Sequence, residues 1–251
     1  MNQNFTLENY KDLLEYFGQT HKFTLFKDYN EKETEKIILL RHDIDYSLKY
    51  AYEIAKMEAQ LGVKSTYFLL FSSPFYNMLD EENISLAQEI ANLGHEIGLH
   101  YDVTVISKGN RANPQSLFDA EINLLANLID TPIRTIAMHN PSISGDDIFR
   151  ESSFINTYDE KFVKEMAYFS DSCMAWRDNF IKHLDQGNFP SKIQLLIHPI
   201  LWTKQILGRY EKLDQFFQTK ISSIEDLIND CRKIWKDHSG VIEHDRRQKH
   251  Q

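Results

Sequence analysis

The feature that most constrains this chain is a series of short apolar segments, each of which ends in an acidic or imidazole side chain. Five such segments, at residues 37–45, 96–101, 135–139, 167–170 and 193–198, have the length and apolar content of buried strands. Their polar ends are Asp43 with Asp45, His100, His139, Asp171 and His198. Because the carboxyl ends of parallel strands share one rim, the pattern predicts one site built from five strand ends.

The segments between these strands have helical periodicity. Helices are expected at residues 6–18, 47–61, 85–93, 116–129 and 223–236, and further strands at 22–26 and 65–71. Strands that alternate with helices indicate a parallel sheet covered by helices, and both a barrel and an open doubly wound sheet fit this alternation. We expect a single domain over residues 1–251, with a frayed polar tail after about residue 238.

The charge balance disfavours polyanionic partners. The 251 residues carry a net charge of −9, which repels nucleic acid and anionic membrane surfaces. No run approaches the ~20 apolar residues that cross a bilayer, so no membrane insertion is expected. The N-terminus lacks the basic and apolar regions of a signal peptide, and the chain has only two cysteines. Both observations predict a reducing, cytoplasmic location.

Two aspartates follow the first strong strand in the sequence Arg-His-Asp-Ile-Asp. Residues two apart on a strand face the same side, so Asp43 and Asp45 point together, about 7 Å apart along the chain. Two carboxylates this close repel each other unless a cation or a shared proton intervenes. The pair therefore fits either a metal ligand beside a base or, without function, a polar strand end before a helix.

Two histidines flank the next polar strand, and they differ in position. His95 and His100 are five residues apart, so on a strand they face opposite sides and lie roughly 16 Å apart. They cannot bind the same ion. His100 ends the strand and is the candidate ligand, whereas His95 begins it and is interpreted as structural.

His198 ends the last apolar strand, where an imidazole can serve as acid, base or ligand. Asp171 ends another strand and could orient it by a hydrogen bond. Trp176 and Trp202 fit an apolar wall or ordinary packing. Cys173 is not expected to be a nucleophile, because no histidine lies near it in sequence.

These residues resemble the motifs of the polysaccharide deacetylases, the NodB-homology group or carbohydrate esterase family four. The resemblance covers about residues 37–202. Leu40–Asp45 resembles the first motif, Thr66–Phe68 the strand after it, Gly94–His100 the second motif and Leu195–Pro199 the fifth, with Asp171 and Trp176 a loose match to the fourth.

The resemblance implies a distorted (β/α) barrel of about seven parallel strands and a metal-dependent hydrolysis of an N- or O-acetyl group on a sugar. It assigns the base to Asp43, metal ligation to Asp45 and His100, and the general acid to His198. The implied metal is a divalent ion, zinc or else cobalt, manganese or nickel. A cytoplasmic enzyme would act on a glycan precursor such as a nucleotide-linked sugar.

Two positions depart from the family pattern. Thr104 stands where the family has its second metal histidine, and the third motif reads Met138-His139-Asn140-Pro141 without its usual arginine. A catalytic zinc usually has three protein ligands, and we assign the third to His139, with Asp102 as its competitor. In the alternative, His139 replaces the arginine and hydrogen-bonds Asp43.

Two other functions fit the same residues. One is an amide hydrolase that acts on a small non-peptide C–N compound, as some relatives of the family do. The other is a carbohydrate-binding protein that keeps the barrel and has lost the metal, which the two departures would explain. Metal binding together with release of a product would separate an enzyme from a binding protein.

Overall fold

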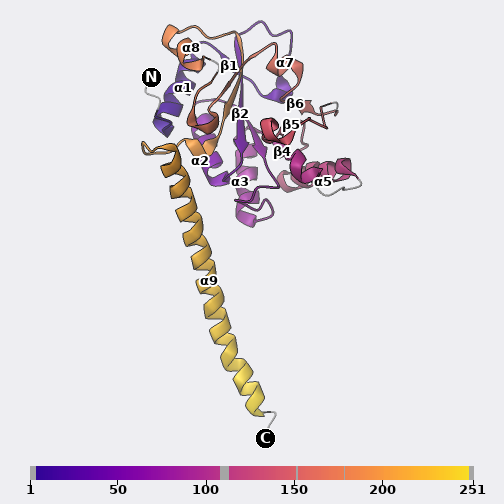
Figure 1. Ribbon diagram of the computed structural model, residues 1–251, viewed down its shortest axis with the longest axis vertical. Coiled ribbons are helices and arrows are strands. Elements are labelled where there is room, and N and C mark those ends of the chain that lie inside the picture. The colour runs from indigo at the N-terminus through magenta and orange to yellow at the C-terminus, as the bar shows by residue number, and fades with distance from the viewer. Residues whose placement is uncertain (1–3, 108–112, 151, 178, 249–251) are drawn as a thin grey trace. The chain divides into compact units, whose positions relative to one another are not determined.

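The computed structural model describes residues 4–107, 113–150, 152–177 and 179–248. The chain divides into two compact units, Met1–Ile206 and Leu207–Gln251. The first unit contains the whole sheet, and the second contains one long helix, α9, coloured yellow in Figure 1. The prediction of one domain over the whole chain stays a prediction.

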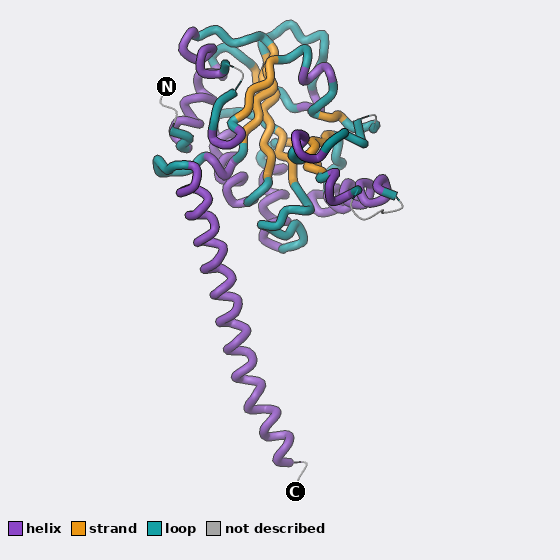
Figure 2. The backbone as a smooth tube through the Cα atoms, viewed as in Figure 1, coloured by secondary structure: helices purple, strands orange, loops and turns teal. Residues whose placement is uncertain are grey.

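The first unit is built on a parallel sheet, which Figure 2 shows at its centre with helices around it. Seven strands run in the spatial order β6-β5-β4-β3-β2-β8-β7, and β1 pairs with β2 beside this path. The strands are β1 Lys22–Phe23, β2 Ile37–Ile44, β3 Thr66–Leu69, β4 Glu96–Tyr101, β5 Thr135–Met138, β6 Ile155–Asn156, β7 Ala167–Ser170 and β8 Lys192–Ile197. This curled sheet of seven parallel strands confirms the predicted distorted barrel.

Helices connect the strands, as parallel pairing requires. They are α1 Leu7–Gly18, α2 Leu48–Gln60, α3 Glu81–Asn92, α4 Val103–Ile106, α5 Pro114–Ile129, α6 Pro141–Ser144, α7 Glu160–Val163 and α8 Phe180–Gln186, with 3₁₀ turns η1 Phe26–Asp28, η2 Ser172–Met174 and η3 Pro199–Leu201. The expected helices of this unit are present, although α3 begins at Glu81 and not near residue 85. The sequence did not predict β6, since two residues carry no periodicity.

Two strands at the centre of the sheet, β2 and β4, are buried along their whole length. Every residue of β2 and β4 is buried, including the polar ones. The side chains inside the curl therefore pack closely against one another, and their size is limited.

Gly98, in the middle of β4, lies where this packing leaves no room for a side chain. A methyl group there would lie 2.5 Å from the Phe68 ring and 2.9 Å from the carbonyl oxygen of Thr135. The Phe68 ring is fully buried and also contacts Arg41, so it has no room to move. Gly98→Ala is therefore expected to destabilise the unit by about 1–3 kcal/mol, measured by urea unfolding. Gly18→Ala is the control, because a methyl group there would meet no atom within 4 Å outside the adjacent backbone of its own helix. Equal stabilities for the two variants would contradict this packing argument.

The second unit differs from expectation. Helix α9 runs over Arg209–Gln248, well beyond the predicted range of 223–236, and it includes the residues predicted as a frayed tail. The prediction followed the strongest apolar periodicity, whereas the helix also includes polar residues that are compatible with helical backbone. Residues 249–251 lie outside the described part. None of the helices in the described residues is both long enough and apolar enough to span a membrane.

Candidate active site

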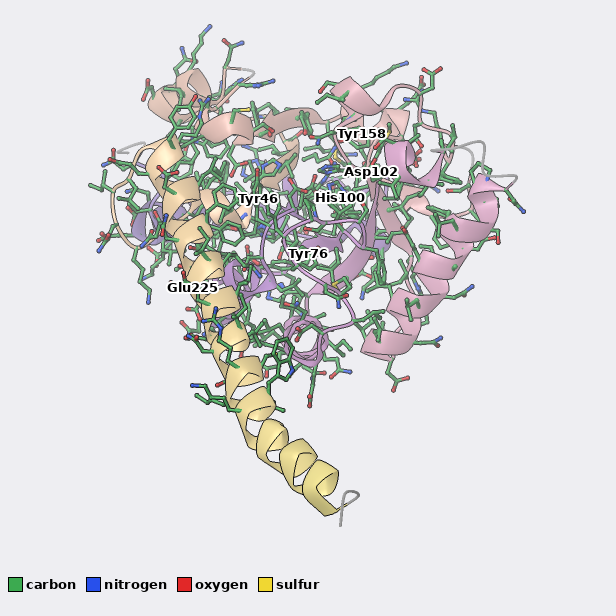
Figure 3. All side chains as sticks on the ribbon, turned by 60° about the horizontal axis from the view of Figure 1, so that its bottom comes forward. Tyr46, Tyr76, His100, Asp102, Tyr158 and Glu225 are labelled. Carbon is green, nitrogen blue, oxygen red and sulfur yellow. The ribbon has the colours of Figure 1, made fainter. Side chains whose placement is uncertain are left out.

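The predicted strand ends meet at the carboxyl rim of the curled sheet, where Figure 3 labels His100 on β4. Asp43, on β2, and Asp45, just after this strand, approach the same atom of this residue. His100 Nε2 lies 3.6 Å from Asp43 Oδ2 and 3.4 Å from Asp45 Oδ1. Strand alternation thus placed the two carboxylates on one side, as the sequence predicted.

A second histidine completes a three-residue cluster. His139 follows β5, which pairs directly with β4, and its Nδ1 lies 3.3 Å from Asp45 Oδ1 and 3.1 Å from His100 Nε2. Ligand atoms of Asp45, His100 and His139 all lie within 4.8 Å of one another. These are the three residues that the sequence analysis assigned to metal.

Hydrogen bonds outside the cluster orient the His100 ring. Its Nδ1 lies 2.9 Å from the carbonyl oxygen of Ala137, which can only accept, so Nδ1 carries the proton. In the neutral ring, Nε2 then presents its lone pair to Asp45 and His139. Backbone carbonyls fix metal-ligating histidines in this way.

His139 is held from the opposite side. The side-chain amide of Asn140 donates to His139 Nε2 at 2.8 Å, which leaves the ring proton on Nδ1, inside the cluster. A cation there would displace that proton to Nε2, and the Asn140 amide would then turn to accept it. Metal binding at Nδ1 would therefore change the tautomer of the neutral ring without releasing a proton.

The donor set fits a divalent cation. Asp45 Oδ1 is buried and makes no hydrogen bond of good geometry, although the two imidazoles lie beside it. Burial raises the pKa of Asp45, but the adjacent imidazoles of His100 and His139 hold it well below its usual range. Burial likewise lowers the pKa of His139, but the adjacent carboxylate of Asp45 outweighs this effect and raises that pKa. Two imidazoles and one carboxylate form a common catalytic zinc set.

The competing ligand, Asp102, is used elsewhere. Its Oδ1 accepts hydrogen bonds from the backbone nitrogen of Thr104 at 2.8 Å and from the Thr104 hydroxyl at 2.7 Å, which caps α4. Thr104 therefore supports a helix start. The position at which the family has its second metal histidine, Thr104, is thus part of this helix cap.

Removal of His139 tests the third ligand. His139→Ala is expected to weaken zinc binding by more than about 100-fold, because even residues that only support a ligand contribute 10–100-fold. Thr104→Ala should leave the affinity unchanged. Zinc titration against a competing chelator measures both variants. Unchanged affinity after loss of His139, with loss of affinity in Asp102→Ala, would transfer the role to Asp102.

Asp43 is held by a partner that the sequence analysis did not identify. Arg41 Nε and Nη2 donate to Asp43 Oδ1 and Oδ2, each at 2.8 Å, and the arginine is fully buried. Burial raises the pKa of Asp43, but the charge of Arg41 outweighs it and lowers the pKa below its usual value. Arg41 therefore occupies the role that the alternative interpretation gave to His139. Its position two residues before Asp43, on the same strand face, was the available signal.

The arginine is itself fixed by several acceptors. Its Nη1 donates to Thr157 Oγ1 at 2.8 Å and to Gln194 Oε1 at 3.3 Å, and its Nη2 donates to the Tyr158 hydroxyl at 3.1 Å. Every guanidinium nitrogen is thus hydrogen-bonded. Asp43 is consequently held in one orientation.

His198, which follows β8, is oriented by Asp171 as expected. Asp171 Oδ1 lies 2.6 Å from His198 Nδ1, and Trp202 Nε1 donates to Asp171 Oδ2 at 2.8 Å. Although burial lowers it, the charge and hydrogen bond of Asp171 raise the pKa of His198 to about 9, with smaller effects from Asp45 and Asp43. Trp202 therefore has a polar role, while Trp176 stacks on Phe180 at 3.9 Å.

The loop between β3 and α3 supports the Asp45 backbone. The Ser73 hydroxyl donates to the Asp45 carbonyl at 2.7 Å, and the Tyr76 hydroxyl donates to the Ile44 carbonyl at 2.8 Å. Tyr46, next in sequence, stacks on Phe75 at 4.7 Å (Figure 3 labels Tyr46 and Tyr76). No local pattern in the sequence indicated these contacts.

Fold and site together define a parallel β/α protein with a two-histidine, one-carboxylate centre at the carboxyl rim of its strands. No protein-family model matches the sequence, and no curated protein matches it. The solved structures similar to it include carbohydrate esterase family 4 proteins.

Three of these structures illustrate the likeness. A polysaccharide deacetylase from Bacillus cereus is 15% identical, with a TM-score of 0.47 over 74% of this chain and 88% of that one. A family 4 acetyl xylan esterase from Clostridium thermocellum, in complex with a cobalt ion, is 12% identical, with a TM-score of 0.44 over 74% and 84%. A CE4 family pseudoenzyme from Bacillus anthracis is 18% identical, with a TM-score of 0.44; the match covers 76% of this chain and 62% of that protein.

Proposed function

We propose that this chain is a metal-dependent carbohydrate deacetylase, a hydrolase that removes an N- or O-acetyl group from a sugar. The observation that carries the proposal is the arrangement around His100 Nε2. The Asp43 carboxylate, which Arg41 holds in place, lies 3.6 Å from this atom, and Asp45 and His139 lie 3.4 and 3.1 Å from it. A separate imidazole, paired with Asp171, completes the rim.

The proposed metal ligands are Asp45, His100 and His139, with zinc as the preferred ion and cobalt, manganese or nickel as alternatives. A divalent cation bound there would supply a more acidic water and polarise the acyl carbonyl. The chain itself would supply the proton transfers.

Asp43 is proposed as the base. Its low pKa keeps it ionised at neutral pH, so it is always able to accept a proton. The same low pKa makes it a weak base, and it can take a proton efficiently only from a nucleophile that is itself acidified. Arg41 would keep the carboxylate in place during this transfer.

His198 is proposed as the general acid. With its pKa raised to about 9, the ring is protonated at neutral pH and can donate to the leaving amine or alkoxide. Asp171 would stabilise the charged ring and fix its orientation. The substrate is proposed to be a carbohydrate, with a nucleotide-linked sugar as the form expected in the cytoplasm.

Metal removal tests the proposal. Chelation is expected to abolish acetate release from a panel of acetylated oligosaccharides and nucleotide sugars, and zinc or cobalt should restore it. The His139→Ala protein is the matched control, because it should respond poorly to added metal at the same concentration. Full acetate release by metal-free protein would contradict the mechanism, and metal binding without release of acetate from any substrate would contradict the deacetylase proposal.

A further inference from the structure

Helix α9 of the second unit presents apolar side chains to solvent along much of its length. Every residue from 221 to 236 is exposed. Trp235 is 74% exposed and Leu227 is 63% exposed. Contiguous exposed apolar side chains mark interaction surfaces more often than single ones do. The exposed apolar residues are Ile221, Ile224, Leu227, Ile228, Ile234 and Trp235.

The spacing of these residues is that of a coiled coil. The heptad stripe, defined here as Ile221, Ile224, Ile228, Cys231 and Trp235, has alternating steps of three and four residues. Apolar residues at this spacing of 3.5 residues are typical of helices that wind around each other. A single helix packed on a globular surface needs no such strict repeat.

We propose that α9 forms a parallel coiled coil with α9 of other copies of this chain. A stripe that recurs every heptad is complementary to itself, because each copy offers the same residues and the same spaces between them. The stripe runs from Ile221 to Trp235, about 21 Å along the helix axis. Helices in water gain most of their stability from packing of an apolar face, which this assembly would provide.

Charged residues beside the stripe select the parallel direction. Lys220 comes just before Ile221, the first residue of the stripe, and Glu225 comes just after Ile224, the second. These are the g and e positions that flank the core of a coiled coil. In parallel helices, a g residue of one helix faces the e residue five positions later on the other. Each Lys220 would then approach Glu225 of the neighbouring copy. In antiparallel helices these two kinds of position do not meet.

The residue types at the stripe favour more than two helices. Isoleucine occupies both kinds of core position, at Ile221 and Ile228 and at Ile224, and this combination shifts coiled coils to trimers or tetramers. The apolar Leu227 widens the face beyond what a two-stranded coil covers. We expect three copies.

The mass of the full chain in solution tests the proposal. Light scattering after size-exclusion chromatography should give about three times the chain mass. Ile228→Glu should give a monomer, whereas the neighbouring Asn229→Glu, which adds the same charge off the stripe, should keep the assembly. Circular dichroism of both variants would show whether the first unit remains folded. A wild-type chain that is monomeric at all concentrations, or an Ile228→Glu variant with the wild-type mass, would overturn the proposal.

A charge exchange tests the direction independently of folding. Lys220→Glu alone should raise the dissociation constant about tenfold or more, because it opposes two glutamates, and Lys220→Glu with Glu225→Lys should restore it. No difference between the single and double variants would overturn the parallel arrangement. A monomer that binds anionic phospholipid vesicles through this face would overturn self-association and assign the face to a membrane surface.

Discussion

Asp43→Asn is expected to lower kcat for acetyl hydrolysis by about 10²–10⁴-fold while the protein keeps its metal. The substitution removes the proposed proton acceptor but leaves Asp45, His100 and His139 in place. An asparagine can accept only one of the two hydrogen bonds from the buried Arg41, so the variant should also be less stable, and its rate is measured on protein shown to be folded. Steady-state acetate release and metal analysis on the same sample measure the two effects.

Asp45→Asn is the matched comparison, because it makes the same chemical change two residues away, on a carboxylate that lies beside the same histidine. It is expected to lose metal affinity first, and activity in consequence. At saturating zinc, Asp45→Asn should recover more activity than Asp43→Asn does. The reverse pattern would mean that the two roles are exchanged, and equal rates with equal metal would contradict both assignments.

The site was predictable to the extent that it follows from local rules. Strand alternation placed Asp43 and Asp45 together, and sequential neighbouring of strands placed His139 beside His100. Both rules need only the order of residues along the chain, which the sequence gives directly. The curled parallel sheet was predictable for the same reason, because apolar strands alternate with helices.

The partners of these residues were not predictable, since they depend on tertiary packing. Trp202 reaches Asp171 from beyond a 3₁₀ turn, and Ser73 reaches the Asp45 carbonyl from a loop. Arg41 lay within reach of the alternation rule, yet an arginine in a buried strand is interpretable only once Asp43, Thr157 and Gln194 are seen around it. Long-range hydrogen bonds of this kind leave no periodicity in a sequence.

A second buried network lies behind the site, on the outer side of the strands, and it centres on Glu58 of α2. The carboxylate accepts from the Tyr67 hydroxyl at 2.7 Å, from Ser65 Oγ at 2.5 Å and from the Tyr10 hydroxyl, and it pairs with His42 Nε2 at 2.7 Å. All of these side chains are buried. An ionised carboxylate is acceptor-only with about four lone-pair sites, which four donors fill.

Glu58→Gln is therefore expected to destabilise the protein by about 3–5 kcal/mol at pH 7, although the two side chains have the same shape. Glutamine offers one acceptor oxygen in place of two and turns two donor hydrogens toward hydroxyl groups that are already donating. Urea unfolding measures the change. Glu53→Gln, on the exposed side of the same helix, is the control and should change stability by no more than about 0.5 kcal/mol.

The pH dependence of the stability difference between wild type and Glu58→Gln tests whether it comes from the charge of the Glu58 carboxylate. Although burial raises it, the charge and hydrogen bond of His42 lower the pKa of Glu58 to about 2. In the unfolded chain the pKa of a glutamate is about 4.3. Above pH 4.3 the lower pKa of Glu58 in the folded state stabilises the fold by about 3 kcal/mol. This stabilisation is lost as the pH falls from about 4.3 toward 2. The gap between wild type and Glu58→Gln should accordingly narrow by about 1 kcal/mol between pH 7 and pH 3.5. A gap that stays constant over this range would show that the network stabilises the fold through packing and not through the ionised carboxylate.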